Sequence, residues 1–223
     1  MAAESKARKK RRVAKIIDIL REAYPDARCA LDHTNPLELL VATVLSAQCT
    51  DRRVNVVTKG LFARYRTAAD YAAAEPAALE QQVRSTGFFR NKAANIRAAC
   101  RQIVERHGGK VPDTMEALVA LPGVARKTAN VVLGNAFGTP SIIVDTHVLR
   151  VSGRLGLASP HNVEHKYADK IEQELMEACP KPQWTRFSNL LSFHGRCICI
   201  AGRPRCPICP VNSLCPYPNK TKA

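Results

Sequence analysis

The stretch LPGVARKTANVVL, residues 121–133, places a Pro-Gly turn directly before an apolar-periodic run and so predicts a tight turn that leads into a helix. Lys127 falls in what should be the first turn of that helix. A helix N-terminus presents unpaired backbone N–H groups and a partial positive charge, so it attracts anions and tolerates a cation poorly. Lys127 is therefore expected either to bind the same anion or to carry out chemistry beside it.

The composition favours a polyanionic partner. The 223 residues suffice for one large domain or two small ones, and 34 Lys and Arg against 19 Asp and Glu give a formal net charge of +15. This balance favours nucleic acid, with an anionic membrane as the alternative. No apolar run approaches the roughly 20 residues of a membrane-spanning helix, and no signal-peptide core follows the basic N-terminus. We expect an intracellular protein with no membrane partner, in the cytoplasm or nucleoid of a bacterium or the nucleus of a eukaryote.

The N-terminal segment is basic and then amphipathic. Six of the seven residues from Lys6 to Arg12 are basic, which fits a solvated tail, a nucleic-acid contact or a nuclear address. Behind them Val13, Ile16, Ile17 and Leu20 recur at helical spacing, so the segment continues as an amphipathic helix.

Signals for helix starts and stops recur along the rest of the chain. The predicted starts are Asn35 with Pro36, Thr50, Pro76, Asn91, a capping box of Asp113 and Glu116, and Asp145; the predicted stops are Gly87 and the pair Gly108 and Gly109. The one strand-like run, SIIV at 141–144, is predicted as an extended connection. Short helices without sustained two-residue alternation predict an all-α fold.

The cysteines cluster near the C-terminus. Five of the nine lie within CICIAGRPRCPICPVNSLC, where Cys199, Cys206, Cys209 and Cys215 are spaced C-x6-C-x2-C-x5-C. In an intracellular chain such thiols indicate a metal site rather than disulfides. Zinc and a [4Fe-4S] cluster both accept four thiolates, so this chemistry alone leaves the two open, and Cys197 competes with Cys199 for the first ligand position.

Together the hairpin stretch and the cysteine spacing point to a family. LPGVARKTA resembles the helix-hairpin-helix of the endonuclease III family of DNA glycosylases, and the cysteine spacing resembles the iron-sulphur loop of that family. The stretches LSAQCTD (45–51), STGFFRNKAANI (85–96), VDTHVLRV (144–151) and HGR (194–196) are similar to the family in the same order. The resemblance thus runs essentially from end to end of the chain.

The resemblance implies a two-domain, all-α helix-hairpin-helix glycosylase fold. A six-helix domain would span residues 29–139, with the hairpin at about 114–134, and a cluster domain would combine residues 1–28 and 140–223, with the iron-sulphur loop at 199–215. The implied cofactor is a [4Fe-4S] cluster held by Cys199, Cys206, Cys209 and Cys215. The implied partner is double-stranded DNA with a damaged base or an abasic site, and we expect a monomer.

The function implied is that of a bifunctional DNA glycosylase and AP (abasic-site) lyase of base excision repair, which removes oxidised pyrimidines. Lys127 matches the amine that attacks C1′ of a flipped-out nucleotide, forms a Schiff base and cuts the strand 3′ to the abasic site by β-elimination. Asp145 matches the family's catalytic aspartate, which takes up a proton or stabilises positive charge on the sugar. Asp145 also fits a helix cap, and the two roles are compatible.

The hairpin residues match the family's phosphate-binding turn. Gly123 permits a tight turn in which the backbone N–H groups of Leu121, Gly123, Val124 and Ala125 approach a phosphate. Ala125 departs from the second glycine that is usual there. Alanine is strained at that position only if its φ is positive.

Other positions carry over individually. Gln48 matches a residue that fills the space left by the flipped nucleotide, and Phe88 stands where the family often has a leucine wedge. Asp51 and His147 match polar positions that line the pocket, and Arg203 resembles a basic residue that contacts phosphate.

Three alternatives are weighed against this reading. Adenine glycosylases and thymine mismatch glycosylases of the same superfamily are monofunctional and usually lack a lysine at the position of Lys127. Adenine glycosylases also carry a large additional C-terminal domain, whereas this sequence ends eight residues after Cys215. A non-catalytic iron-sulphur DNA-binding module is disfavoured by the presence of both Lys127 and Asp145.

Overall fold

The computed structural model describes residues 4–222, and over that range it consists of α-helices and short 3-10 helices without any strand. The all-α prediction is confirmed. Contacts within the chain divide it into two compact units, one formed by residues 29–139 and the other by the segments up to residue 28 and from residue 140. Within the described range, no helix combines the length and apolar character that crossing a membrane requires.

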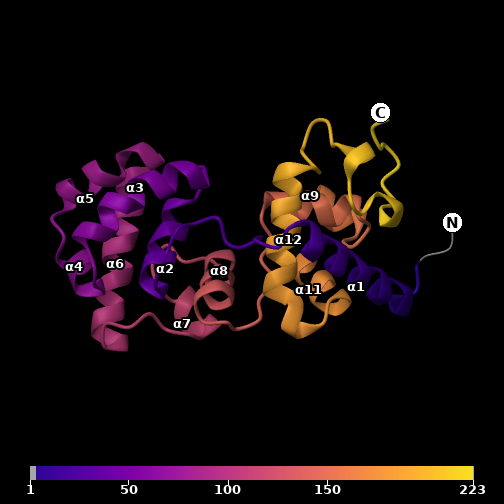
Figure 1. The fold of residues 1–223 in the computed structure, drawn as a ribbon. Coiled ribbons are helices and arrows are strands. Elements are labelled where there is room, and N and C mark those ends of the chain that lie inside the picture. Colours follow the sequence, from indigo (N-terminus) through magenta and orange to yellow (C-terminus); the bar gives the residue numbers. More distant parts are fainter. Residues whose placement is uncertain (1–3, 223) are drawn as a thin grey trace. The chain divides into compact units, whose positions relative to one another are not determined.

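Residues 29–139, which we call the hairpin unit, consist of helices joined by short connections (Figure 1). The helices are α2 (Pro36–Leu45), α3 (Asp51–Arg64), α4 (Ala68–Ala73), α5 (Pro76–Val83), η1 (Arg84–Thr86), α6 (Phe89–His107), α7 (Met115–Val119) and α8 (Arg126–Ala136).

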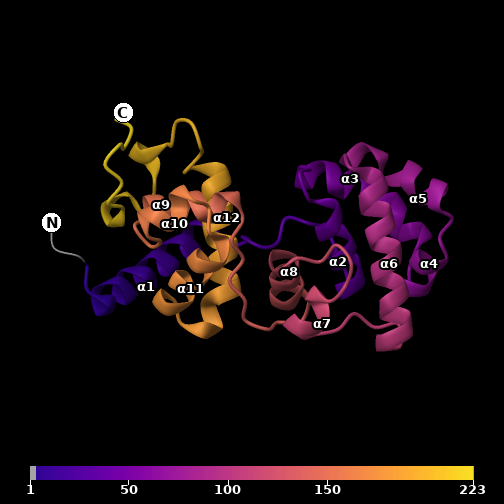
Figure 2. The same ribbon diagram turned by 180° about the vertical axis from the view of Figure 1, so that it is seen from behind.

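The remaining described residues, 4–28 and 140–222, form what we call the cysteine unit (Figure 2). Its helices are α1 (Lys6–Ala23), α9 (Thr146–Arg154), α10 (Pro160–Glu164), α11 (Ala168–Ala178), η2 (Lys181–Gln183), α12 (Trp184–Cys197), η3 (Cys206–Ile208) and η4 (Asn212–Leu214).

Three predicted helix starts are confirmed by side-chain caps. The side chains of Asn35, Thr50 and Asp145 accept hydrogen bonds from backbone N–H groups three residues later, at 3.0, 3.3 and 2.7 Å. Each cap satisfies one of the N–H groups that a helix leaves without an internal partner, and a cap contributes about 1 kcal/mol. These starts are therefore set by local sequence.

In the hairpin unit, two predicted starts are wrong and one helix is not predicted. α6 begins at Phe89 rather than Asn91, because Phe88 adopts a left-handed conformation (φ 47°) that turns the chain directly into the helix. α7 is capped by Thr114, one residue after Asp113, and its Oγ accepts from Ala117 N–H at 3.3 Å. The unpredicted helix is α4, which brings the hairpin unit to seven α-helices where six were predicted; it is stabilised by a capping box in which Asp70 fills the place usual for Glu or Gln.

The core of the hairpin unit is built around α2 and α6. All seven residues from Leu39 to Leu45 are buried, so α2 is surrounded by other helices, and it contacts α3, α6 and α8. α6 buries a stripe that includes Ile96, Cys100 and Ile103 and contacts α4 and α5 (Figure 1). Positive φ angles at Gly108 and Gly109 end α6 as predicted.

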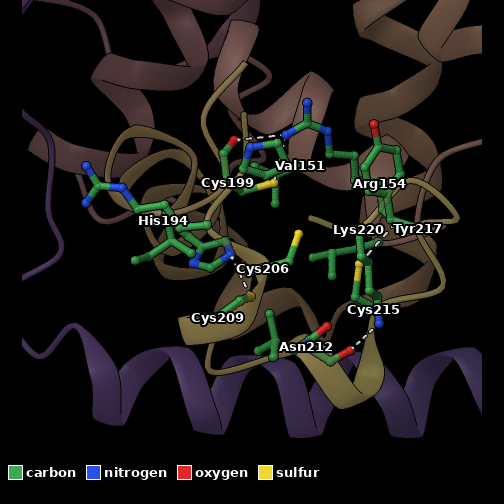
Figure 3. Close-up of a pocket in the computed structure, with 15 residues that line it drawn as sticks. Val151, Arg154, His194, Cys199, Cys206, Cys209, Asn212, Cys215, Tyr217 and Lys220 are labelled. Atoms are coloured by element: carbon green, nitrogen blue, oxygen red, sulfur yellow. Dashed lines mark hydrogen bonds between the residues drawn. The ribbon is translucent and has the colours of Figure 1, made fainter. Parts of the chain in front are cut away.

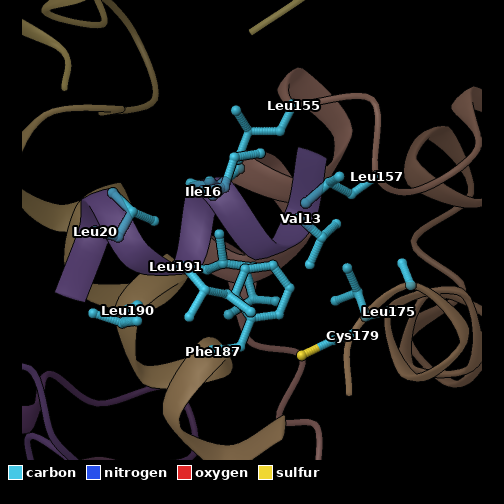
Figure 4. Close-up of a cluster of buried hydrophobic side chains, with 14 of the residues drawn as sticks. Val13, Ile16, Leu20, Leu155, Leu157, Leu175, Cys179, Phe187, Leu190 and Leu191 are labelled. Carbon is cyan, nitrogen blue, oxygen red and sulfur yellow. The ribbon is translucent and has the colours of Figure 1, made fainter. Parts of the chain in front are cut away.

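In the cysteine unit, the N-terminal helix packs against helices from the C-terminal half. The apolar face of α1 is buried. Its residues Ile16 and Leu20 lie in one cluster with three residues of α12, namely Phe187, Leu190 and Leu191 (Figure 4). Burial of a Leu or Ile side chain contributes about 1.5–3 kcal/mol, so α1 is bound to this unit by its hydrophobic face. The predicted amphipathic helix is thereby confirmed, but it begins at Lys6, so the basic run 6–12 forms its first turns rather than a tail in front of it.

The segment at 141–144 connects to α9 in an extended conformation, as predicted. The N–H of Ser141 donates to Thr185 Oγ at 3.1 Å, and the N–H of Ile143 donates to Ser188 Oγ at 2.9 Å. Side chains of α12 thus take the place of a neighbouring strand and fix the path of the chain into Asp145.

Candidate functional site

The hairpin is formed by α7, a six-residue connection and α8. Leu121 and Val124 are buried, and their N–H groups donate within the hairpin, to Leu118 O and Leu121 O at 3.1 Å each. These two N–H groups are therefore engaged internally, contrary to the expectation that they face a phosphate, because the turn folds back on itself. Across the described chain, the N–H groups of Gly123 and Ala125 enter no hydrogen bond.

Gly123 is required by both conformation and packing. Its φ is +76°, and a Cβ at this position would lie 2.7 Å from the Cβ of Asn95 on α6. A side chain here would meet steric strain and a collision at once. The glycine therefore lets the turn approach α6 closely.

Ala125, by contrast, is unstrained. It is the N-cap of α8 with φ −86° and ψ 167°, an extended conformation that any residue adopts. Its side chain offers no cap, and the first turn of α8 contains no acidic residue. Without a side-chain cap or an acidic residue, this helix terminus is suited to an external anion.

Lys127 is the second residue of α8, and its side chain is exposed. Lys127 therefore lies in the first turn beside the uncapped terminus, as the stretch 121–133 predicts. Gln48, Asp51 and Phe88 belong to the same unit. Gln48 and Phe88 are exposed, with left-handed φ values of 52° and 47°, and Asp51 is the half-buried first residue of α3.

Asp145 lies in the cysteine unit, where both of its oxygens accept hydrogen bonds. Oδ1 accepts from Val148 N–H at 2.7 Å, and Oδ2 accepts from Ser192 Oγ at 2.7 Å. The carboxylate is thus held in one orientation from α9 and α12. Sequence reasoning misses Ser192; the available signal is its spacing of four from Ser188, which puts the two serines on the same face of α12.

His147 is positioned by the close packing of α9 on α12. Its Nδ1 accepts from the Arg150 guanidinium at 3.2 Å, and the same guanidinium donates to Gly195 O at 2.8 Å. A Cβ at Gly195 would lie 2.9 Å from the His147 Cβ, which explains the glycine of the HGR motif. Burial lowers the pKa of His147 below its ordinary value, against the opposing effect of Asp145, and favours the neutral ring.

Four cysteines line one cavity of the cysteine unit. Cys199, Cys206, Cys209 and Cys215 are arranged around it, together with Arg154 and His194 (Figure 3). Cys197 is exposed at the end of α12 and is not among the lining residues. Over residues 4–222, no three His, Cys, Asp or Glu side chains are gathered closely enough to hold one metal ion.

Two side-chain nitrogens lie within hydrogen-bonding distance of sulfurs in the cavity. Arg154 Nη1 lies 3.3 Å from Cys199 Sγ, and His194 Nε2 lies 3.6 Å from Cys209 Sγ (Figure 3). Burial raises the pKa of Cys209 to about 11 and also raises that of Cys215. Soft sulfur ligands in a desolvated pocket suit a cationic iron or zinc centre, which stabilises the thiolate form.

Arg203 is exposed in the connection between Cys199 and Cys206. With Arg205 and Lys222 it lines a shallow hollow on the surface of the cysteine unit. Three cations on one open surface are suited to contact with phosphate groups.

Comparison with known proteins identifies the family. The HhH-GPD superfamily of base excision DNA repair proteins matches residues 41–181, more than half of the chain. Endonuclease III of Synechocystis sp. is 52% identical over 213 residues, which cover 94% of each chain. Endonuclease III of Escherichia coli K12 is 41% identical over 205 residues, 92% of this chain and 95% of that protein.

A solved structure of similar length has the same fold. A trapped endonuclease III–DNA covalent intermediate, described as an estranged-adenine complex, superposes with a TM-score of 0.85 at 47% identity and covers 93% of this chain and 96% of that one. A thermostable thymine-DNA glycosylase with 23% identity and a TM-score of 0.80 shares the fold. The chain therefore belongs to the HhH-GPD superfamily and, within it, to the endonuclease III family of bifunctional DNA glycosylase/AP lyases.

Proposed function

We propose that this protein removes oxidised pyrimidines from double-stranded DNA and cuts the strand 3′ to the resulting abasic site, with Lys127 as the nucleophile. The observation that carries the proposal is the exposed amine of Lys127 beside the uncapped N-terminus of α8. At this position an anionic DNA backbone and a nucleophile can be held together. The DNA complex of the 47%-identical endonuclease III supports the choice of substrate.

The reaction follows from the chemistry of an amine. The neutral Nζ of Lys127 attacks C1′, the C1′–N glycosidic bond breaks, and the base departs with a proton. Loss of the ring oxygen from C1′ leaves a Schiff base on the opened sugar. Removal of a proton from C2′ then expels the 3′ phosphate by β-elimination, which cuts the strand. The target nucleotide must first leave the base stack to expose C1′.

Asp145 is proposed to stabilise the positive charge that develops on the sugar as the base departs. Its two hydrogen bonds, from Val148 N–H and Ser192 Oγ, fix the carboxylate without neutralising it. The proposed DNA contacts are the free N–H groups of Gly123 and Ala125 with phosphate, and Gln48 and Phe88 with the bases around the extruded nucleotide. Leu121 and Val124 contribute by anchoring the turn.

We propose that Cys199, Cys206, Cys209 and Cys215 hold a [4Fe-4S] cluster. Four thiols that line one cavity, with nitrogens of Arg154 and His194 near two of the sulfurs, fit an iron-sulphur centre. When bound, the cluster supplies a cationic centre that ties the loop 199–215 together. The protein should be yellow-brown, and Cys199→Ser should lose the colour whereas Cys197→Ser should keep it. If Cys197→Ser loses the colour and Cys199→Ser keeps it, Cys197 rather than Cys199 is the first ligand. Colourless protein that contains one zinc ion would show that the site binds zinc instead of a cluster.

Borohydride trapping tests the proposed nucleophile. Wild-type protein mixed with a duplex that carries an oxidised pyrimidine or an abasic site should form a covalent complex on reduction. Lys127→Gln should abolish both trapping and strand cleavage, while binding to an abasic duplex weakens only by roughly 1 kcal/mol, since backbone N–H groups supply much of the phosphate contact. The matched control is Lys110→Gln, another exposed lysine of the hairpin unit, which should trap normally.

Two outcomes would contradict the assignment. Trapping by Lys127→Gln would place the nucleophile on another amine. Base removal by the wild-type protein without any trapping would instead identify a monofunctional glycosylase. We also propose that the protein acts as a monomer, which light scattering of the purified protein and of its DNA complex would test.

A further inference from the structure

Lys92 is a buried cation that the proposed reaction does not use. Only 5% of this α6 residue is exposed, and its Nζ donates to the carbonyls of Leu45 and Thr86 at 2.8 Å each. No carboxylate among the described residues forms an ion pair with it. An ammonium group is costly to bury, so its two carbonyl contacts must offset a large loss of hydration.

The two carbonyls occupy equivalent positions in different elements. Leu45 is the last residue of α2, and Thr86 is the last residue of η1. Carbonyls at the end of a helix lack an internal N–H partner and carry partial negative charge, which a cation satisfies well. One ammonium therefore caps two helix ends and joins them.

Each of these ends leads directly to a strained, exposed residue. Gln48 follows Leu45 by three residues, and Phe88 follows Thr86 by two. Both are non-glycine residues with left-handed φ values, 52° and 47°, and among the described residues only Lys166 shares this property. A left-handed conformation costs such a residue about 1–2 kcal/mol, so the surrounding structure must enforce it.

The backbone of Lys92 adds a third contact. Its N–H donates to Phe88 O at 3.1 Å, so Lys92 binds the chain on both sides of Gly87. The side chain of Phe88 remains 63% exposed. Lys92 thus fixes where the backbone presents Phe88 without covering its ring.

We propose that Lys92 is the positioning residue that holds Gln48 and Phe88 in the geometry needed to distinguish damaged from intact DNA. The inference rests on the proposed function, in which these two side chains contact the bases around an extruded nucleotide. Stability alone does not call for a lysine, because methionine would fill nearly the same space without a charge to bury. Methionine would, however, leave both carbonyls unpaired and allow the two loops to move independently.

The test compares Lys92→Met with a destabilised control on the same helix. Ile103→Ala removes a fully buried side chain three turns further along α6 and should lower the melting temperature without affecting the loops. Amide hydrogen exchange should rise at residues 46–49 and 87–91 in Lys92→Met and remain at the wild-type level there in Ile103→Ala.

The functional measurement is the ratio of Kd for an undamaged duplex to Kd for an abasic duplex. Lys92→Met should lower this ratio by about tenfold or more, since misplacing a positioned group by about 1 Å can cost about 100-fold. Ile103→Ala should preserve it. Combined with Gln48→Ala and Phe88→Ala, Lys92→Met should change the ratio by less than about twofold, because the side chains that it positions are already absent.

The outcomes separate this inference from the function on which it rests. If Gln48→Ala and Phe88→Ala reduce the ratio but Lys92→Met does not, the positioning role is wrong while the proposed DNA contacts stand. If neither loop variant reduces the ratio, the proposed contacts themselves fail. Should Lys92→Met not fold, Lys92→Gln, which keeps a donor, should fold with intermediate exchange and discrimination, and wild-type values in both would also overturn the proposal.

Discussion

At the scale of single residues, Asp145 combines a helix cap with a proposed electrostatic role, and its two oxygens allow these to be separated. Asp145→Asn keeps an oxygen that can accept from Val148 N–H but removes the negative charge. We expect stability to remain within about 0.5 kcal/mol of wild type and base removal to slow more than cleavage of a preformed abasic site. Single-turnover assays on the two substrates measure the difference.

The matched variant, Asp145→Ala, removes cap and charge together. It should show the same kinetic defect and an additional loss of about 1 kcal/mol in the free energy of unfolding. Equal slowing on both substrates by Asp145→Asn would contradict a role in departure of the base.

His147 provides a prediction for pH. Burial lowers its folded-state pKa below 6.5, so the unfolded chain binds a proton first as the pH falls. The free energy of unfolding should therefore decrease as the pH drops from about 6.5 through the folded-state pKa, and His147→Gln should decrease less steeply. Urea titrations at a series of pH values compare the two proteins; an identical slope would mean that His147 is protonated equally in both states.

Single residues also show where sequence reasoning stops. The positions of Lys127 and Asp145 at helix termini are predictable because each belongs to a local motif, whereas their proposed roles come from the family resemblance. Ser192 is not, since its value lies in a contact 47 residues away in the chain, with Asp145 Oδ2. Whether Ala125 is strained depends on its backbone conformation, which the sequence leaves open and the structure resolves as extended.

At the scale of elements, substitutions at Gly123 and Ala125 test which of these two small residues the hairpin requires for stability and DNA binding. Gly123→Ala places a Cβ in a left-handed residue and 2.7 Å from Asn95 Cβ, so it should destabilise the protein by more than about 1 kcal/mol and weaken DNA binding. Thermal unfolding and binding to an abasic duplex measure both effects. The strain arises in the turn that presents the N–H groups proposed to bind phosphate.

The control is Ala125→Gly, the opposite substitution two residues further along the same turn. Ala125 already has an extended backbone, so glycine should lower stability by less than about 1 kcal/mol, through the greater entropy of the unfolded chain, and leave binding nearly unchanged. A gain in DNA affinity from Ala125→Gly would mean that the turn adopts a positive φ at this position when DNA is bound.

The ends of a helix are predictable from sequence when the interactions that fix them join residues close together in the chain. Asn35, Thr50 and Asp145 are recognised because each cap joins residues only three apart. The start of α6 is missed because the left-handed Phe88 is supported by Lys92, whose side chain also reaches Leu45, 47 residues away. The contact of Lys92 with Leu45 O, which makes the start of α6 unpredictable from local sequence, is also the contact on which the proposed role of Lys92 in damage recognition depends.

At the scale of the whole molecule, the pairing of α1 with the C-terminal helices cannot be read from periodicity. The apolar stripe of α1 predicts a buried face but not its partner, and only the family resemblance supplies the partner. The structure adds Arg12, whose guanidinium donates to the Glu4 carboxylate and to the carbonyls of Leu155 and Leu214. Arg12 is therefore structural, although by sequence it belongs to the basic tail.

The basic residues at the start of α1 are therefore of two kinds, exposed ones that can contact DNA and Arg12, which holds the fold together. The salt dependence of DNA binding can separate them. If exposed Lys10 and Arg11 contact phosphate, Lys10→Gln with Arg11→Gln should reduce the slope of log Kd against log salt by up to about 1.8, at about 0.9 per contact. Arg12→Gln should leave the slope unchanged but lower stability by about 2 kcal/mol, because it leaves the carbonyls of Leu155 and Leu214 without their donor. An unchanged slope in the double variant would assign the net charge of +15 to other surfaces, and a reduced slope in Arg12→Gln would show that α1 must be intact to reach DNA.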